Sequence, residues 1–131
     1  MATTLLNPLE LSPPRGFSHG AIGSGRLLYV AGQTGTDNTG KSVGDDLVAQ
    51  FDRALEAVVR VVQAAGGKPE DIVKINLLVV NKKEYRERGK EIGVAYRKHL
   101  GRHFPAMTLA EVKGLFEDSD KVEIEAVAMV P

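Results

Sequence analysis

The sequence has no cysteine, no net charge and no long apolar run, and each absence excludes a class of function. Without cysteine, the chain forms neither disulfides nor a thiolate nucleophile. Its 17 basic residues balance 17 acidic ones, so no long-range field steers a polyanion toward it. We therefore expect neither nucleic acid nor a membrane surface as a partner.

No apolar run approaches the roughly 20 residues that a membrane-spanning helix needs. Residues 1–16 lack the basic and apolar stretches of a signal peptide, so a cytoplasmic location is the expectation. The 131 residues are 43% hydrophobic and 26% charged, without repeats or an internal linker. This composition predicts one globular domain over residues 1–131.

The first third of the chain is rich in strand-forming residues. After a short first strand, the prolines within residues 8–14 predict an irregular segment, since proline donates no ladder hydrogen bond. Residues 17–22 and 27–33 then indicate a β-hairpin around Gly23-Ser24-Gly25. Residues 34–44 are rich in glycine and are expected to form a loop.

Two helices are predicted in the middle of the chain. Asp45 or Asp46 can cap the first, which runs to about residue 65, where Gly66 and Gly67 end it. Its apolar stripe, at spacings of three and four, consists of Leu47, Phe51, Ala54, Leu55, Val58, Val59 and Val62.

The second predicted helix covers residues 84–100. Its apolar side consists of Tyr85, Ile92, Tyr96 and Leu100. Gly89 and Gly93 lie one turn apart within it, and each costs up to about 1 kcal/mol relative to alanine. We interpret them as positions that permit close packing against a neighbour.

Three further strands are predicted over residues 72–80, 107–112 and 122–130. The first is apolar on both faces, as expected of a strand covered on each side. The element order is β-β-(β)-α-β-α-β-β, and right-handed crossovers place both helices on one face of a mixed sheet. The bare face is a candidate interface between copies.

Five short motifs follow one another along nearly the whole chain. They are Phe17-Ser18-His19-Gly20, Leu28-Tyr29-Val30-Ala31-Gly32-Gln33, Ala64-Ala65-Gly66-Gly67 with Glu70-Asp71-Ile72-Val73-Lys74, Phe104-Pro105-Ala106, and Val122-Glu123-Ile124-Glu125-Ala126. Each motif is weak alone, but in this order and at this spacing they resemble the YjgF/RidA (Rid) family.

The resemblance implies a fold, an assembly and a reaction class. The fold is a chorismate-mutase-like α/β (α+β) subunit, which forms a homotrimer with small-molecule clefts between neighbours. Archetypal members hydrolyse enamines and imines, released by pyridoxal-phosphate enzymes, to a keto acid and ammonia. The chain has no cofactor motif of its own, so we expect no cofactor.

The chain departs from the family pattern at three positions. Where archetypal members carry an arginine that clamps the substrate carboxylate, it has Met107, whose thioether offers neither charge nor donor. Phe17 stands where a tyrosine is frequent, and Leu109 where a cysteine is frequent. We therefore expect the cleft near Phe17, Met107 and Glu123 to bind a small neutral or weakly polar molecule.

Glu123 is the candidate catalytic residue. The resemblance implies that it lies in the cleft, where it would position or activate a water. The alternative is that Glu123 and Glu125, which point to one face of a strand, are simply solvated. Gly32 is predicted to contribute backbone to the ligand site, although residues 32–35 lack the lysine of a phosphate loop.

Four more polar residues have two interpretations each. His19 is either a general acid or base beside Phe17 or a hydrogen-bonded structural histidine. Thr108 can offer its hydroxyl to a ligand or be an ordinary strand residue. His99 and His103 have the spacing of a metal pair, but no third ligand is near, so we expect charges at a helix end and no metal.

Three functions are compatible with these observations. The first is an imine or enamine deaminase with a non-archetypal site. The second is a non-catalytic metabolite-binding or chaperone-like trimer, which the combined loss of arginine, phenol and thiol favours. The third is a ribonuclease or translation inhibitor, which the zero net charge and the missing aromatic-basic platform disfavour.

Overall fold

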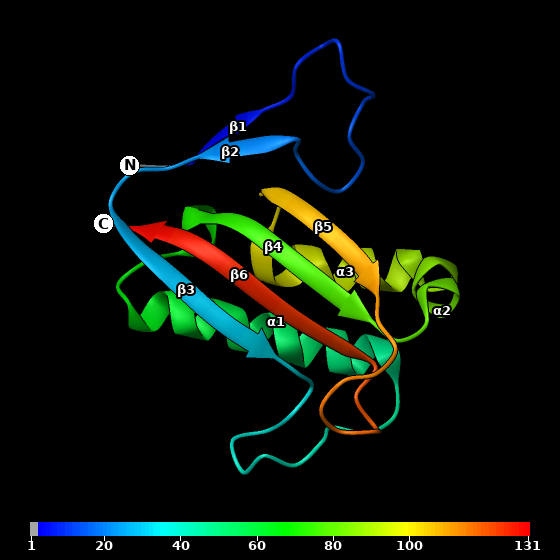
Figure 1. Ribbon diagram of the computed structural model, residues 1–131. Coiled ribbons are helices and arrows are strands. Elements are labelled where there is room, and N and C mark those ends of the chain that lie inside the picture. Colours follow the sequence, from blue (N-terminus) through cyan, green and yellow to red (C-terminus); the bar gives the residue numbers. More distant parts are fainter. Residues whose placement is uncertain (1–2) are drawn as a thin grey trace.

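A four-stranded mixed sheet backed by helices dominates the structure, with a two-stranded ribbon beside it (Figure 1). The computed structural model describes residues 3–131, so residues 1 and 2 of the predicted domain lie outside it. In sheet order, the strands are β3 (Arg26–Gln33), β6 (Val122–Val130), β4 (Ile72–Val79) and β5 (Ala106–Glu111). The β4–β5 pair is parallel, whereas β6 runs antiparallel to both β3 and β4. The predicted mixed sheet with its helices on one face is confirmed.

Helix α1 (Leu47–Ala64) begins where the sequence predicted. The side chain of Asp46 caps it by accepting a hydrogen bond of 2.9 Å from the backbone N–H of Ala49. After the helix, Gly66 adopts a left-handed backbone with φ of 87°, which glycine reaches without strain. All seven residues of the predicted apolar stripe are buried against the sheet. A single 3-10 turn, η1 (Pro69–Asp71), then leads into β4.

The second predicted helix is two helices, α2 (Lys82–Glu87) and α3 (Gly89–Leu100). The break falls at Arg88, whose φ of −96° and ψ of 20° leave the helical region. Its guanidinium bonds Glu91 on α3 and Asp46 at the start of α1. Arginine is a good helix former, so the local sequence does not indicate a break at Arg88. The break coincides with the contact between Arg88 and Asp46 on another element. Among residues 3–131, no helix has the length and apolar character of a bilayer span.

The predicted hairpin over residues 17–33 is wrong. Strand β2 (Gly20–Ile22) pairs with β1 (Thr4–Leu6), whereas β3 pairs with β6. The chain changes sheets at Gly25, which has φ of 128° and lies so close to the carbonyl of Val130 that any Cβ would overlap it. Strand β6 offers β3 a long partner with matching apolar positions, and the three-residue β2 does not.

The core lies between the sheet and the helices. Along β6, Ile124 and Ala126 are buried against the helices, while Glu123 and Glu125 point to the other face. Nothing within residues 3–131 packs as a layer over that open face, where Tyr29 is 74% exposed. The sequence predicted that the strand over residues 72–80 is covered on both sides, but within one chain the helices cover only one.

Gln50 is a buried polar side chain that joins three segments. It lies on the inner side of α1 and is 1% exposed. Its amide nitrogen donates to the carbonyls of Gly44, at 2.8 Å, and Ser119, at 3.1 Å. Its amide oxygen accepts from the backbone N–H of Lys121 at 2.8 Å. The amide thus anchors both the loop before α1 and the loop before β6.

Replacing Gln50 with leucine should lower the free energy of unfolding by about 2–3 kcal/mol, because buried backbone groups lose their partners while the volume is kept. Urea denaturation measures this change. The matched control is Gln63→Leu on the exposed side of the same helix, which should stay within about 0.5 kcal/mol of the parent. Equal effects of the two substitutions would contradict the anchoring role.

Candidate functional site

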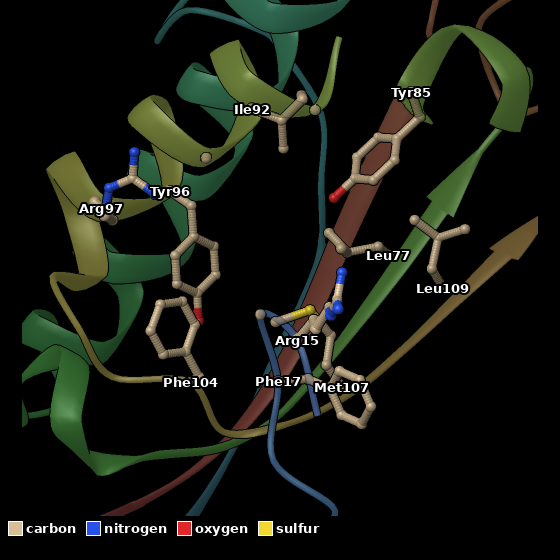
Figure 2. Close-up of a pocket in the computed structure, with 13 residues that line it drawn as sticks. Arg15, Phe17, Leu77, Tyr85, Ile92, Tyr96, Arg97, Phe104, Met107 and Leu109 are labelled. Atoms are coloured by element: carbon tan, nitrogen blue, oxygen red, sulfur yellow. The ribbon is translucent and has the colours of Figure 1, made fainter. Parts of the chain in front are cut away.

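A cavity of about 540 Å³ opens on the helix side of the sheet (Figure 2). It lies between the N-terminal segment (residues 15–17), the strands β4 and β5, and the helices α2 and α3. Its apolar lining comprises the aromatic residues Phe17, Tyr85, Tyr96 and Phe104 and the aliphatic or thioether residues Leu77, Ile92, Met107 and Leu109. This size and composition are typical of a small-molecule site.

Because of the register of β5, the side chains of Met107 and Leu109 face this pocket. Both stand at positions where the chain departs from the family pattern. Met107 pairs with Ile75 and Leu109 with Leu77, and both β4 residues are buried on the helix side. Side chains alternate along a strand, so Met107 and Leu109 face the same way as their partners. The position of the archetypal arginine is therefore at the pocket wall.

The N-terminal segment brings Phe17 to the same wall. The backbone N–H of Ser18 donates to the carbonyl of Pro105 at 3.0 Å, which places Phe17 beside the start of β5. The His19 ring packs edge-on against Phe17, with centroids 5.4 Å apart. Its Nε2 lies 2.7 Å from the carbonyl oxygen of Ser12. His19 thus packs against Phe17 and contacts the Ser12 backbone, but it does not itself line the pocket.

A stacked aromatic pair closes one end of the pocket. The rings of Tyr96 and Phe104 lie 5.3 Å apart and within 6° of parallel. The Tyr96 hydroxyl donates to the carbonyl of His103 at 2.7 Å, and burial raises the pKa of this phenol. The pair therefore ties α3 to the loop that leads into β5.

Tyr85 supplies the one hydroxyl that points into the pocket (Figure 2). Burial raises the pKa of Tyr85 to about 12, so the phenol stays protonated at neutral pH. Within the described residues its hydroxyl has no hydrogen-bond partner closer than 3.5 Å. It is available to donate a hydrogen bond to a bound molecule.

Gly89 and Gly93 line the pocket, and neither packs against another segment of the chain. A Cβ on Gly89 would meet no atom within 4 Å, and one on Gly93 would meet only the side chain of Arg97. The interpretation of these glycines as positions for close packing against a neighbouring element is therefore wrong within one chain. Their small size instead leaves this side of the cavity open.

Glu123 lies on the opposite, open face of the sheet, against Gly32. A Cβ on Gly32 would overlap the Glu123 carboxylate, so only glycine leaves room for it. The strand register is irregular between Val30 and Gln33, where Gly32 lies. Glu123 is half-buried, and its carboxylate accepts no hydrogen bond from residues 3–131. It is free to bind a water or a ligand.

Thr108 lies on the same open face as Glu123. It pairs with Asn76 across the sheet, and its hydroxyl accepts a 2.8 Å hydrogen bond from Nζ of Lys74. Asn76 in turn donates to Glu125 at 3.0 Å. Thr108 therefore belongs to a row of polar residues that runs from the edge strand β5 across β4 to β6 on the open face, and not to the pocket of Met107.

The predicted site residues thus form two sets that the sheet separates. Phe17 and Met107 share the helix-side pocket, and Gly32 and Glu123 share the open face. Within one chain, the two sets do not meet. A single site containing both requires a second copy.

The histidine pair at the end of α3 takes part in structural hydrogen bonds. Burial acts to raise the pKa of Asp52 on α1, but the hydrogen bonds of its carboxylate with Nε2 of His99 and with Lys98 hold this pKa below its usual value. Nε2 of His103 lies 2.8 Å from the carbonyl oxygen of Ile72. In the part of the chain that the structure describes, no group of three His, Asp or Glu side chains could hold a metal.

Sequence reasoning missed three polar residues of the pocket, namely Arg15, Tyr85 and Arg97. Tyr85 was assigned to an apolar helix side, and the arginines belong to segments without a motif. One feature of the sequence could have indicated the pocket. Two glycines lie on the same helix face as two aromatic residues, and such a face leaves space beside an apolar surface.

The fold and the pocket define a mixed α/β protein with a small-molecule cavity, and the comparisons with known proteins identify the family. The family model described as Endoribonuclease L-PSP matches residues 8–130. A solved structure of a conserved Rid family protein from Yersinia pestis has a TM-score of 0.88 and 32% identity, covering 99% of this chain and 100% of that chain. The chain therefore belongs to the YjgF/RidA family, as its motifs predicted.

Two curated relatives illustrate the range of names in this family. The 2-iminobutanoate/2-iminopropanoate deaminase of Salmonella typhimurium is 33% identical over 105 residues, which is 80% of each chain. A RutC family protein of Pyrococcus horikoshii is 30% identical over 109 residues, or 82% of each chain. The solved YjgF gene product of E. coli has a TM-score of 0.68 at 29% identity, covering 94% of this chain and 92% of that one.

Proposed function

We propose that this protein is a Rid-type hydrolase that assembles as a trimer and cleaves an imine or enamine in the cleft between neighbouring copies. One observation carries the proposal. Each face of the sheet bears half of the predicted site, with Phe17 and Met107 on one and Gly32 and Glu123 on the other. The similarity to a named deaminase supports the proposed reaction class.

The open face of the sheet supports the assembly. Leu27 and Tyr29 on β3 are 53% and 74% exposed, and Val127 and Met129 lie opposite them on β6. These four side chains form an apolar patch on the β3–β6 side of the open face, and an exposed apolar patch is stable when another layer covers it. A second copy would cover it and bring its own pocket toward Glu123.

The chemistry needs a water, a base and a place for the departing nitrogen. Glu123 takes a proton from water as the water oxygen bonds to the imine carbon, the C=N electron pair moves to nitrogen, and Glu123 returns the proton to that nitrogen. The carbinolamine then loses its hydroxyl proton to Glu123 as the C=O bond forms and the C–N bond breaks, and Glu123 passes this proton to the departing nitrogen, which leaves as ammonia. The sum is imine plus water to carbonyl plus ammonia. Tyr85 remains a hydrogen-bond donor throughout and orients the ligand.

The direct test supplies 2-iminopropanoate, generated in situ by an amino-acid oxidase, and measures ammonia release with and without the protein. Acceleration by the protein, together with a trimer in light scattering, is the expected result. A clean monomer at micromolar concentration would overturn the shared cleft. A folded trimer that accelerates neither this imine nor larger ones would overturn the hydrolase assignment.

A non-catalytic binding protein is the second candidate, and a specific observation favours it. All three departures from the archetypal pattern, at Phe17, Met107 and Leu109, line the same pocket. At these three positions the pocket lacks the arginine, the tyrosine and the cysteine of the family pattern. It can therefore hold a ligand without the side chains that the archetypal reaction uses. Native mass spectrometry that finds a metabolite on the protein, with no turnover of imines, would favour this function.

Gly32→Ala should reduce imine hydrolysis at least about tenfold while leaving the melting temperature nearly unchanged. The added methyl group would displace the Glu123 carboxylate, a flexible group whose movement costs little stability. The rate of ammonia release and a thermal melt measure the two quantities. Gly114→Ala is the matched control, since a Cβ there meets no atom within 4 Å. Unchanged turnover in Gly32→Ala would remove Gly32 from the site.

A further inference from the structure

Two arginines without carboxylate partners line the pocket of Phe17 and Met107. Arg15 and Arg97 are both exposed lining residues. Within residues 3–131, no Asp or Glu oxygen lies within 4.0 Å of either guanidinium, whereas Arg53, Arg60 and Arg88 all form such pairs. The net charge of the chain is zero, so the positive charge at this cavity is a local concentration and not part of an overall positive charge.

The two arginines reach the pocket from different elements (Figure 2). Arg15 belongs to the N-terminal segment and lies two residues before Phe17. Arg97 lies one turn after Gly93 on α3, and its Nη1 is only 3.1 Å from the place that a Cβ on Gly93 would occupy. The glycine therefore lets this guanidinium lie back along the helix, as side chains on helices do.

The surroundings make these arginines suited to an anion. A guanidinium binds carboxylate through two parallel hydrogen bonds, and the attraction grows where apolar walls exclude water. Four aromatic rings and four aliphatic or thioether side chains form those walls, and Tyr85 adds one neutral donor. A ligand that satisfies both parts has an apolar body and one negative end.

We propose that Arg15, whose guanidinium lies beside Met107, binds the carboxylate of a small organic acid whose aryl-bearing body fills the pocket, and that Arg97, on the α3 side of the same cavity, adds a second positive charge. The proposal rests on the proposed function in so far as the same cavity holds the substrate. It replaces the neutral ligand that Met107 alone suggested, because the positive charge enters from positions outside the family motif. Arg15 and Arg97 are thus specificity-determining residues for acidic substrates.

The test uses 3-phenylpropanoate and its uncharged counterpart, 3-phenylpropanamide, neither of which contains a bond that the enzyme would cleave. Isothermal titration calorimetry with the full chain should show that the carboxylate binds about tenfold more tightly than the amide. Arg15→Gln and Arg97→Gln should each weaken carboxylate binding about three- to tenfold, with amide binding unchanged. Arg102→Gln, an exposed arginine outside the pocket, should alter neither.

Equal affinity for the two compounds would overturn the proposal. The same conclusion follows if the double arginine variant binds the carboxylate as well as the parent, or if neither compound binds at millimolar concentration. Because the probes do not react, their binding is separate from turnover. Arginine-dependent binding without any imine hydrolysis would support the role of the arginines in carboxylate binding and contradict the proposed hydrolase function. Hydrolysis of acidic imines with unchanged KM in the double variant would contradict only the role of the arginines.

Discussion

Glu123→Gln is expected to slow imine hydrolysis at least about a hundredfold, because glutamine keeps the shape of the side chain but cannot accept a proton from water. General bases contribute about 10²- to 10⁴-fold to the rates of reactions that they assist. The carboxylate has no partner within the described residues and lies against Gly32, so its removal leaves no broken structural bond. The rate of ammonia release at saturating imine measures the loss.

The control is Glu125→Gln on the same strand and the same face. Glu125 is exposed and accepts a 3.0 Å hydrogen bond from Asn76, whereas Glu123 is half-buried, lies against Gly32 and accepts no hydrogen bond within the described residues. We expect this variant to retain turnover within about twofold. Equal losses in the two variants would point to a general effect of charge on the open face, and full activity of Glu123→Gln would end its catalytic assignment.

Tyr96→Ala is expected to lower the free energy of unfolding by about 3–5 kcal/mol, the usual cost of deleting a buried aromatic ring. Tyr96 is 7% exposed, stacks on Phe104 and binds the carbonyl of His103. Its loss leaves a void between α3 and the loop before Met107, so ligand binding should fall as well. Urea denaturation and titration with 3-phenylpropanoate measure the two effects.

Tyr96→Phe separates the ring from the hydroxyl. This variant keeps the stack on Phe104 and loses only the hydrogen bond to His103, so about 1 kcal/mol of destabilisation is expected. A larger loss in Tyr96→Phe than half of that in Tyr96→Ala would mean that the hydrogen bond, and not ring packing, holds this end of the pocket.

Local signals were enough for the elements whose residues repeat with a clear period. The apolar stripe and the Asp46 cap predicted α1, and Gly66 predicted its end, because these depend on contacts within a few residues. The alternation of Glu123 and Glu125 with apolar neighbours likewise predicted that both point to one face of β6.

Pairing between distant segments was beyond local signals. The segment around Gly23-Ser24-Gly25 has the chemistry of a hairpin turn, but β3 joins β6, about a hundred residues later, because that partner is longer and its apolar face matches. The break at Arg88 was equally hidden, since it coincides with contacts to Asp46 on another helix.

The sequence by itself determined the family, the mixed α/β fold and the loss of arginine at Met107, since these follow from residue identity and order. Only the tertiary structure decided which residues share a site. It placed Glu123 and Met107 on opposite faces of one sheet and brought Arg15 and Arg97 to one cavity. The physical reason is that the side of a sheet that a residue faces, and its neighbours there, depend on register and packing between segments far apart in the chain.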